Sequence, residues 1–127
     1  MAMSTHFFKA ITKRHAGAVC VIARALVTMA YKPVALRVAA GAPDGTFQVV
    51  VAGDDVQHGK PDPEAYLTAC ARLGVDPANC VAVEDTLNGT LSAEAAGTKV
   101  LVIPIVLTVP VGCNRSRIGA LSSIGLD

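Results

Sequence analysis

Three charged side chains stand where a chain of alternating strands and helices could use them for chemistry. Lys60 lies in a loop between a glycine and a proline, and Glu84 and Asp85 directly follow the apolar run 80–83. In an open parallel sheet, ligands bind outside the carboxyl ends of the strands. If both segments leave strands of such a sheet, a cation and two carboxylates face one crevice. That combination suits a phosphate group and a divalent metal ion.

The lysine has an ordinary interpretation, since most loop lysines are solvated surface charges. Its surroundings argue for more, because the sequence Gly-Lys-Pro-Asp-Pro restricts the backbone on both sides of Lys60. An ammonium group fixed in this way can stabilise the charge that develops on a transferring phosphoryl group.

The paired acids also allow two interpretations. Just past a strand end, Glu84 and Asp85 can both turn toward the crevice, where they repel each other unless a cation lies between them. Mg²⁺ is a hard ion that takes one or two carboxylates together with waters and phosphate oxygens. Alternatively, the acids favour the positive end of the following helix. The two residues alone leave both interpretations open.

Thr28 is a further candidate, because it follows the apolar run 24–27 and its hydroxyl can donate to a phosphate oxygen. A threonine at such a position is more often a capping residue. Asp54 and Asp55 are interpreted as solvated loop acids or as a helix cap.

The apolar runs and the Pro and Gly positions predict the elements that hold these residues. We expect strands and helices in alternation, which is typical of a parallel, doubly wound α/β sheet. The expected strands are 24–27, 47–51, 80–83 and 100–103, and the expected helices are 6–13, 33–40, 63–73 and 89–96. Beyond Pro104 we expect a loop and one short helix.

Composition excludes several classes of protein. A net charge of +1, with 11 basic and 10 acidic residues in 127, leaves no electrostatic footprint for nucleic acid. The four cysteines lack the spacing of a zinc site, and Cys70 and Cys80, which lie in apolar runs, are expected as buried free thiols, which predicts a cytoplasmic protein. The longest apolar run, 100–113, contains two prolines and is too short to cross a membrane.

Taken together, these segments resemble the haloacid dehalogenase-like (HAD) hydrolases, in particular the beta-phosphoglucomutase and sugar-phosphate phosphatase-like branch. The resemblance covers roughly 20–122. Residues 25–28 are similar to the second family motif, whose Ser or Thr binds phosphate, and 59–64 to the third, whose lysine stabilises phosphoryl charge. Residues 81–86, with Asn88 and Gly89, resemble the fourth motif, whose acids hold Mg²⁺.

One family feature is missing from the sequence. The first motif is a strand ending in Asp-x-Asp-Gly-Thr, whose first Asp is the nucleophile, yet this chain has no Asp before Asp44. Residues 43–46 read Pro-Asp-Gly-Thr, but Ala42 stands at the nucleophile position and the stretch follows the second motif. The resemblance therefore implies a partial, Rossmann-like core over 20–127, a three-layer doubly wound parallel sheet without its first-motif strand. A poorly readable segment, 1–19, precedes it, and the run 18–22 is expected to fill part of the gap.

The function that this resemblance implies is that of a Mg²⁺-dependent phosphatase or phosphomutase acting on a small phosphorylated metabolite, although this chain lacks the Asp nucleophile. The alternative is a non-catalytic relative that binds phosphate and Mg²⁺ or a partner protein. We expect no nucleic acid or membrane partner, and self-association through an unpaired sheet edge. The implied site residues are Lys60 as the catalytic residue, Thr28 and Lys60 for phosphate, Glu84 and Asp85 for the metal, and Asn88 and Gly89 in the supporting loop.

Overall fold

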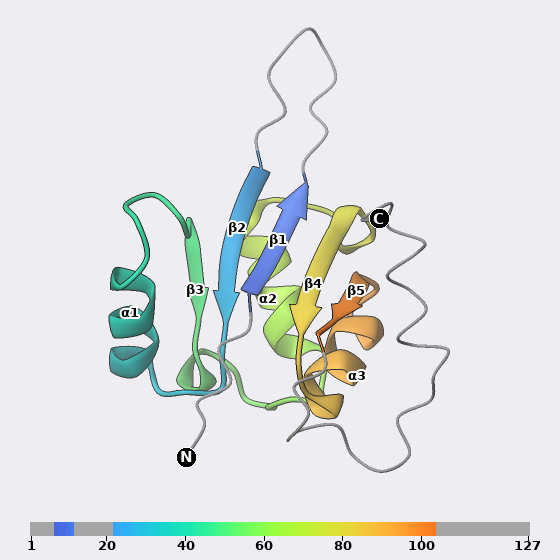
Figure 1. Ribbon diagram of the computed structural model, residues 1–127. Coiled ribbons are helices and arrows are strands. Elements are labelled where there is room, and N and C mark those ends of the chain that lie inside the picture. The colour runs from blue at the N-terminus through green and yellow to red at the C-terminus, as the bar shows by residue number, and fades with distance from the viewer. Residues whose placement is uncertain (1–6, 12–21, 104–127) are drawn as a thin grey trace, which may run out of the picture.

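A five-stranded sheet forms the centre of the molecule (Figure 1). The computed structural model describes residues 7–11 and 22–103. The strands lie in the spatial order β3-β2-β1-β4-β5. Their bounds are Phe7–Ile11 for β1, Ile22–Val27 for β2, Val49–Val51 for β3, Cys80–Glu84 for β4 and Lys99–Val102 for β5.

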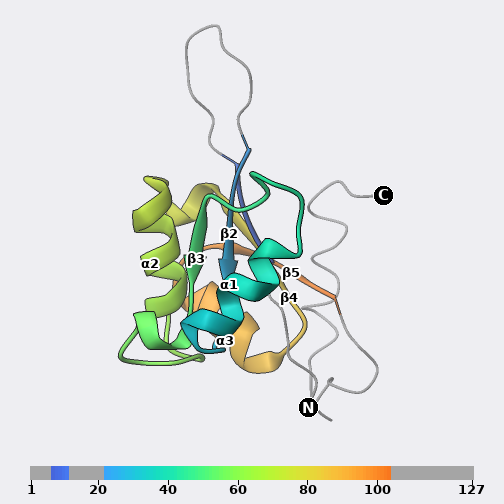
Figure 2. The same cartoon turned by 90° about the vertical axis from the view of Figure 1, so that its left-hand side faces the viewer.

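Helices lie on both sides of this sheet, which gives the three layers that the sequence predicts. The helices α2 and α3 cover one face, and α1 lies on the other side, beside β3 (Figure 2). The pairs β2–β3 and β4–β5 are parallel, as expected. The helices are α1 (Lys32–Ala40), α2 (Glu64–Leu73) and α3 (Leu87–Ala95), with short 3-10 turns η1 (Gly53–Asp55) and η2 (Pro77–Asn79).

Small apolar side chains fill the space between the sheet and α2, in line with a composition of 52% apolar but only 4% aromatic residues. The core includes two free cysteines, Cys70 and Cys80, whose sulfur atoms lie 3.9 Å apart. The expectation of buried free thiols is confirmed for this pair. Within the described residues, no helix is long and apolar enough to cross a membrane.

The amino-terminal strand is where the sequence-based prediction is wrong. The segment 6–13 was expected to be a helix, but Phe7–Ile11 forms β1, which lies between β2 and β4 and runs antiparallel to both. Helical spacing of apolar residues is a local preference, and here it competes with two open strand edges. Their backbone N–H and C=O groups need hydrogen-bond partners, and β1 supplies them on both sides.

The middle of the sheet is therefore filled, although not by the run 18–22 that was expected to fill it. Residues 12–21 lie outside the described part of the chain, and Ile22 already belongs to β2. The sheet is mixed rather than wholly parallel, because β1 runs against its neighbours. Among the strands of the described residues, β3 and β5 are the outermost. Self-association through an edge of the sheet stays a prediction.

The helix ends follow the capping residues of the sequence closely. Asp62 accepts a hydrogen bond from the backbone N–H of Glu64 (2.9 Å) at the start of α2, and Gly74, with φ of 68°, ends that helix. Thr86 caps α3 by accepting from the N–H of Gly89 (3.1 Å). The loop and short helix expected after Pro104 lie outside the described residues.

A network around Asp55 joins α1, η1 and α2. The Asp55 carboxylate accepts hydrogen bonds from Lys32 Nζ (2.6 Å) and from the backbone N–H of Ala52 (2.8 Å), and Arg72 Nη2 lies 3.5 Å away. Burial acts to raise the pKa of Asp55, but these donors outweigh it and lower the pKa to about 2. Of the two interpretations that the sequence left open for Asp55, a solvated loop acid or a cap, its bond to the N–H of Ala52 at the start of η1 supports the cap.

We predict that Asp55→Asn lowers the free energy of unfolding by about 1 kcal/mol at pH 7, after allowance for solvent screening of a surface pair. Because the pKa of Asp55 is depressed in the folded state, its contribution is full above the unfolded value of about 3.9 and is lost as the pH falls toward about 2. Urea titrations at pH 7 and pH 2 should therefore give a clearly smaller difference between wild type and variant at pH 2 than at pH 7. An equal difference at both pH values would contradict the prediction.

Candidate functional site

Lys60 lies at the meeting point of three segments that leave strands. Its side chain is only 4% exposed, and its Nζ lies 2.7 Å from Glu84 Oε1, at the end of β4. The same nitrogen donates to the backbone carbonyl of Val27, at the end of β2 (3.4 Å). The lysine is therefore not the solvated surface charge of the ordinary interpretation. It is a buried cation at the carboxyl ends of β2 and β4, which run in the same direction on either side of β1.

Tyr66 completes this charged cluster, and sequence reasoning missed it. The hydroxyl of this fully buried residue donates to Glu84 Oε1, and Lys60 Nζ lies 3.5 Å from the hydroxyl oxygen and 4.9 Å from the ring centroid. The sequence suggested only an apolar helix position at helical spacing with Cys70 and Leu73. The available signal was its place in the first turn of a helix that follows the lysine loop directly.

The local environment changes the proton affinities of these groups. Burial lowers the pKa of Lys60, while the charge and hydrogen bond of Glu84 and the more distant charge of Asp85 act in the opposite direction. The pKa of Tyr66 is raised, first by its own burial and then by the two carboxylates. The tyrosine therefore stays a protonated hydrogen-bond donor across the physiological range.

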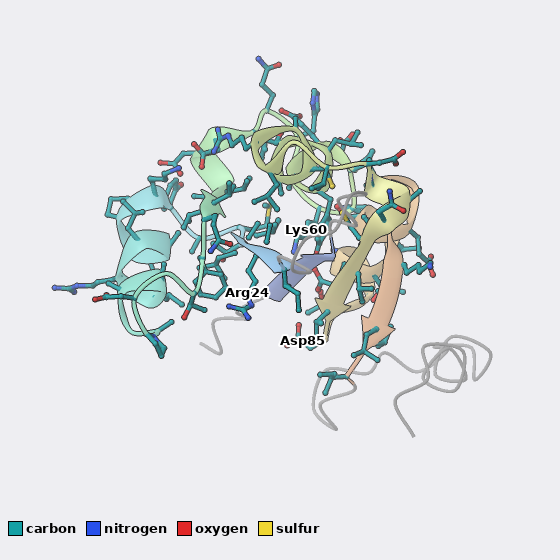
Figure 3. The ribbon with its side chains drawn as sticks, turned by 90° about the horizontal axis from the view of Figure 1, so that it is seen from above. Arg24, Lys60 and Asp85 are labelled. Carbon is teal, nitrogen blue, oxygen red and sulfur yellow. The ribbon has the colours of Figure 1, made fainter. Side chains whose placement is uncertain are left out.

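The adjacent acids are separated by the end of β4. Glu84 is its last residue and is fully buried, whereas Asp85 follows the strand and is half-buried. Seen along the strands, Lys60 and Asp85 both lie near the middle of the sheet (Figure 3). The charge of Asp85 acts on both Lys60 and Tyr66. One acid therefore neutralises the lysine, and the other lies at the border of the cluster.

Thr28 lies next to Val27, whose carbonyl accepts from Lys60, and is almost fully buried. Its backbone N–H donates to Val51 (2.9 Å), and its hydroxyl oxygen accepts from the N–H of Ala30 (3.2 Å). The side chain thus stabilises the turn after β2, but it does not cap a helix, because α1 begins at Lys32 with Tyr31 at its N-cap position. Accepting this bond leaves the hydroxyl hydrogen able to donate to a ligand.

Gly89 shapes the other side of the cluster. A side chain at this position in the first turn of α3 would overlap the carboxylate of Glu84, so the absence of a Cβ lets that carboxylate lie against the helix backbone. Both Asn88 and Gly89 were expected in a supporting loop, but they lie in the first turn of α3, where Asn88 is exposed. The requirement for glycine here comes from close approach, and not from backbone conformation.

The loop that carries Lys60 is held by a second group of polar side chains. The Glu64 carboxylate accepts from the backbone N–H groups of Gln57 (2.8 Å) and His58 (2.9 Å), and the His58 ring lies 2.9 Å away. These backbone hydrogen bonds lower the pKa of Glu64. The side-chain atoms of His58, Asp62 and Glu64 that could bind a metal ion lie within 4.8 Å of one another. The hydrogen bonds of Glu64 hold the loop in place, and the loop carries Lys60 to the carboxyl ends of β2 and β4.

The two acids expected to hold a metal ion differ in their surroundings. Glu84 binds Lys60 and Tyr66, while Asp85 lies half-buried at the end of β4. Mg²⁺ is commonly held by one or two carboxylates, with waters and phosphate oxygens as its other ligands, and a site built on Asp85 fits that pattern. The metal-binding roles of Glu84 and Asp85 stay predictions.

Comparisons with known proteins show which family and which relatives this chain is similar to. The sequence matches the family model of haloacid dehalogenase-like hydrolases over residues 7–97. It is 48% identical over 58 residues to the protein CbbY of Rhodobacter capsulatus and 39% identical over 59 residues to hexitol phosphatase B of Escherichia coli (strain K12). Each match covers 46% of this chain, and 26% and 27% of the respective relatives, so the matches extend over about a quarter of their length.

The fold agrees with these sequence matches. A crystal structure of CbbY from Rhodobacter sphaeroides in complex with phosphate superimposes with a TM-score of 0.62 at 34% identity, over 71% of this chain and 43% of that one. The structure of a beta-phosphoglucomutase-like protein from Thermotoga maritima gives a TM-score of 0.60 at 34% identity, over 75% of this chain and 44% of that one. The expected three-layer α/β fold class is thus confirmed, with the antiparallel central strand β1 as the difference from the predicted sheet.

Proposed function

Because the chain belongs to the haloacid dehalogenase-like hydrolase family, we propose that its Lys60 cluster binds the phosphate group of a small phosphorylated metabolite together with Mg²⁺. The observation that supports this most directly is the nearly complete burial of Lys60 where β2 and β4 end. Glu84 offsets the charge of this buried ammonium group, so burial alone does not require a ligand; the support comes from its position, where ligands bind in open α/β sheets.

The residues of the chain have separate tasks in this proposal. Lys60 supplies a fixed positive charge to the phosphoryl oxygens, and the Thr28 hydroxyl donates to one of them. Asp85 would hold the Mg²⁺, which adds charge neutralisation when it is bound. The loop bonds of Glu64 keep the lysine in place before a ligand arrives, so little reorganisation is needed.

A binding role without turnover is the second candidate, and a feature of β1 favours it. This central strand reads Phe-Phe-Lys-Ala-Ile and offers no carboxylate, while covalent phosphoryl transfer in the family pattern needs an Asp nucleophile there. The described residues thus provide the charge-stabilising groups of a phosphoryl-transfer site. The phosphatase or phosphomutase reaction itself would need a nucleophile in addition.

The test is a calorimetric titration of the 127-residue chain with inorganic phosphate, in the presence and in the absence of Mg²⁺. We expect binding that is strengthened by Mg²⁺ and weakened at least tenfold by Asp85→Asn and by Lys60→Met, in variants shown to be folded by circular dichroism. Asp76→Asn, which changes an acid at the start of η2, serves as the matched control and should bind as wild type does. Absence of phosphate binding by the folded wild-type chain would overturn the proposal.

Hydrolysis of an aryl phosphate, measured on the same samples, separates the two candidates. Turnover that is lost in both Lys60→Met and Asp85→Asn would identify a phosphatase with an additional nucleophile. Phosphate binding without turnover would identify the binding role.

A further inference from the structure

Two free cysteines lie against each other in the core between the sheet and α2. Cys70 and Cys80 are both buried, and their sulfur atoms lie 3.9 Å apart, close to van der Waals contact. They belong to different elements, since Cys70 lies in α2 and Cys80 begins β4. The proposed phosphate site uses neither thiol. The pair therefore forms a second reactive cluster, apart from the Lys60 site.

The same two elements also meet at the Lys60 cluster. Tyr66 lies one helical turn before Cys70 in α2 and donates to Glu84, which is the last residue of β4, whereas Cys80 is its first. The thiol contact thus lies at the amino end of β4 and the tyrosine contact at its carboxyl end. A covalent bond between the two sulfur atoms would join α2 to β4 at the end away from the Lys60 cluster.

Both thiols are protonated and shielded in the folded structure. Burial is the largest cause that raises the pKa of Cys70 to about 12, and burial also raises the pKa of Cys80. The turn before β4 offers a route to the pair, because the Cys80 thiol donates to the backbone carbonyl of Asp76 (3.3 Å), an exposed residue. Local opening of a surface turn exposes a buried group without global unfolding. We therefore expect a slow reaction that proceeds through this opening.

We propose that Cys70 and Cys80 are a modification site, at which a small-molecule disulfide of the glutathione class converts the two thiols into a disulfide bond that links α2 to β4. In the first step, the Cys80 thiol loses its proton to water, and the thiolate attacks the small-molecule disulfide and releases one thiol. The Cys70 thiolate then attacks the Cys80 sulfur atom of the mixed disulfide and releases the second thiol. The protein is oxidised by two electrons, and the reagent is reduced to two thiols. The inference does not depend on the proposed phosphate site.

The contact between the sulfur atoms should favour the disulfide in the folded chain. A disulfide bond needs the two atoms about 2 Å apart, and folding already holds them side by side, so side-chain rotation has only a short gap to close. In an unfolded chain, the same bond must first bring two distant segments together, at a cost in chain entropy. By linkage, a bond that forms more readily in the folded state stabilises that state by the same factor.

The test is the equilibrium between the dithiol and the disulfide in glutathione buffers of graded ratio, measured by mass spectrometry after alkylation of free thiols. The chain has four cysteines, and Cys20→Ser with Cys113→Ser, at positions outside the described residues, leaves only the proposed pair. We expect the equilibrium constant for disulfide formation to be about tenfold larger or more in the folded chain than in the chain unfolded by urea. An equal or smaller constant in the folded chain would overturn the proposal.

A thiol moved to another face of α2 provides the matched control. Ala71 is exposed and adjacent to Cys70, so Cys70→Ala with Ala71→Cys nearly keeps the spacing along the chain but removes the contact. In this variant the folded state should no longer favour the disulfide. An advantage as large as that of the original pair would show that closeness in sequence is responsible, and it would count against the proposal.

The unaltered chain gives a second measurement if the serine variants do not fold, as judged by circular dichroism. It is equilibrated in the same buffers, and its alkylated peptides are mapped. We expect a link between Cys70 and Cys80. A folded chain in which these two cysteines stay reduced, or in which only Cys20 and Cys113 form links, would contradict the proposal.

Discussion

Gly89→Ala is expected to destabilise the protein by about 3 kcal/mol, although the same change at an ordinary helix position stabilises by up to about 1 kcal/mol. The added Cβ would overlap the Glu84 carboxylate, which cannot move away freely because Lys60 and Tyr66 hold it from the other side. Either α3 must shift, at the usual cost of overpacking a core, or the buried ion pair must separate. Equilibrium unfolding in urea measures the difference.

The neighbouring residue provides the control for this prediction. Asn88 lies in the same turn of α3 and is exposed, so Asn88→Ala tests the change in helix propensity without the collision. It should be neutral or slightly stabilising. A Gly89→Ala variant as stable as Asn88→Ala would show that Glu84 does not occupy the position described, and the geometry of the whole cluster would then be in doubt.

The elements after residue 22 were predictable because local signals and tertiary packing agree there. Pro33, Asp62 and Gly74 mark helix ends in the sequence, and the structure places helix ends within a residue or two of them. The strand β2 begins at Ile22 and not at Arg24, and β4 extends to Glu84. Such differences arise because ladder hydrogen bonds continue for as long as a neighbouring strand offers partners.

The amino-terminal strand was not predictable in the same way. Nothing local in Phe7–Ile11 specifies a strand, and its conformation depends on the two open edges of β2 and β4, which are distant in sequence. The predicted gap in the sheet was therefore the correct clue, but the segment chosen to fill it was not. The alternation of strands and helices predicts a parallel sheet and does not indicate a single antiparallel strand within it.

For the candidate site, the residue types could be predicted from the sequence, whereas the contacts between them could not. The sequence indicated Lys60, Glu84 and Asp85 from their places after apolar runs, and the structure brings Lys60 and Glu84 into contact. What the sequence could not show is how the two acids differ. Burial depends on which residue ends the strand, and the partner of Glu84 comes from a helix face that reads as apolar core.

Replacing Lys60 alone should cost more stability than replacing Lys60 and Glu84 together. In Lys60→Met, the Glu84 carboxylate loses its counter-ion while it remains fully enclosed, and removal of one partner of a buried pair typically costs about 3 to 5 kcal/mol. In the double variant Lys60→Met with Glu84→Gln, both charges are absent, and the amide oxygen can still accept from Tyr66. We therefore expect about 2 kcal/mol or more of stability to be regained, as measured by urea unfolding.

Lys32→Met is the matched control, because Lys32 also pairs with a carboxylate, that of Asp55, but its side chain is 34% exposed. A pair near the surface is screened by water, so this variant should lose only about 1 kcal/mol or less. If Lys60→Met were no more destabilised than Lys32→Met, or if the added Glu84→Gln regained nothing, the Lys60–Glu84 pair would not be the charged, buried unit that the distances indicate. A large loss of stability in Lys60→Met, with recovery in the double variant, would instead show that the ion pair stabilises the fold at the carboxyl ends of β2 and β4. The pair would then have a structural role as well as being part of a candidate binding site.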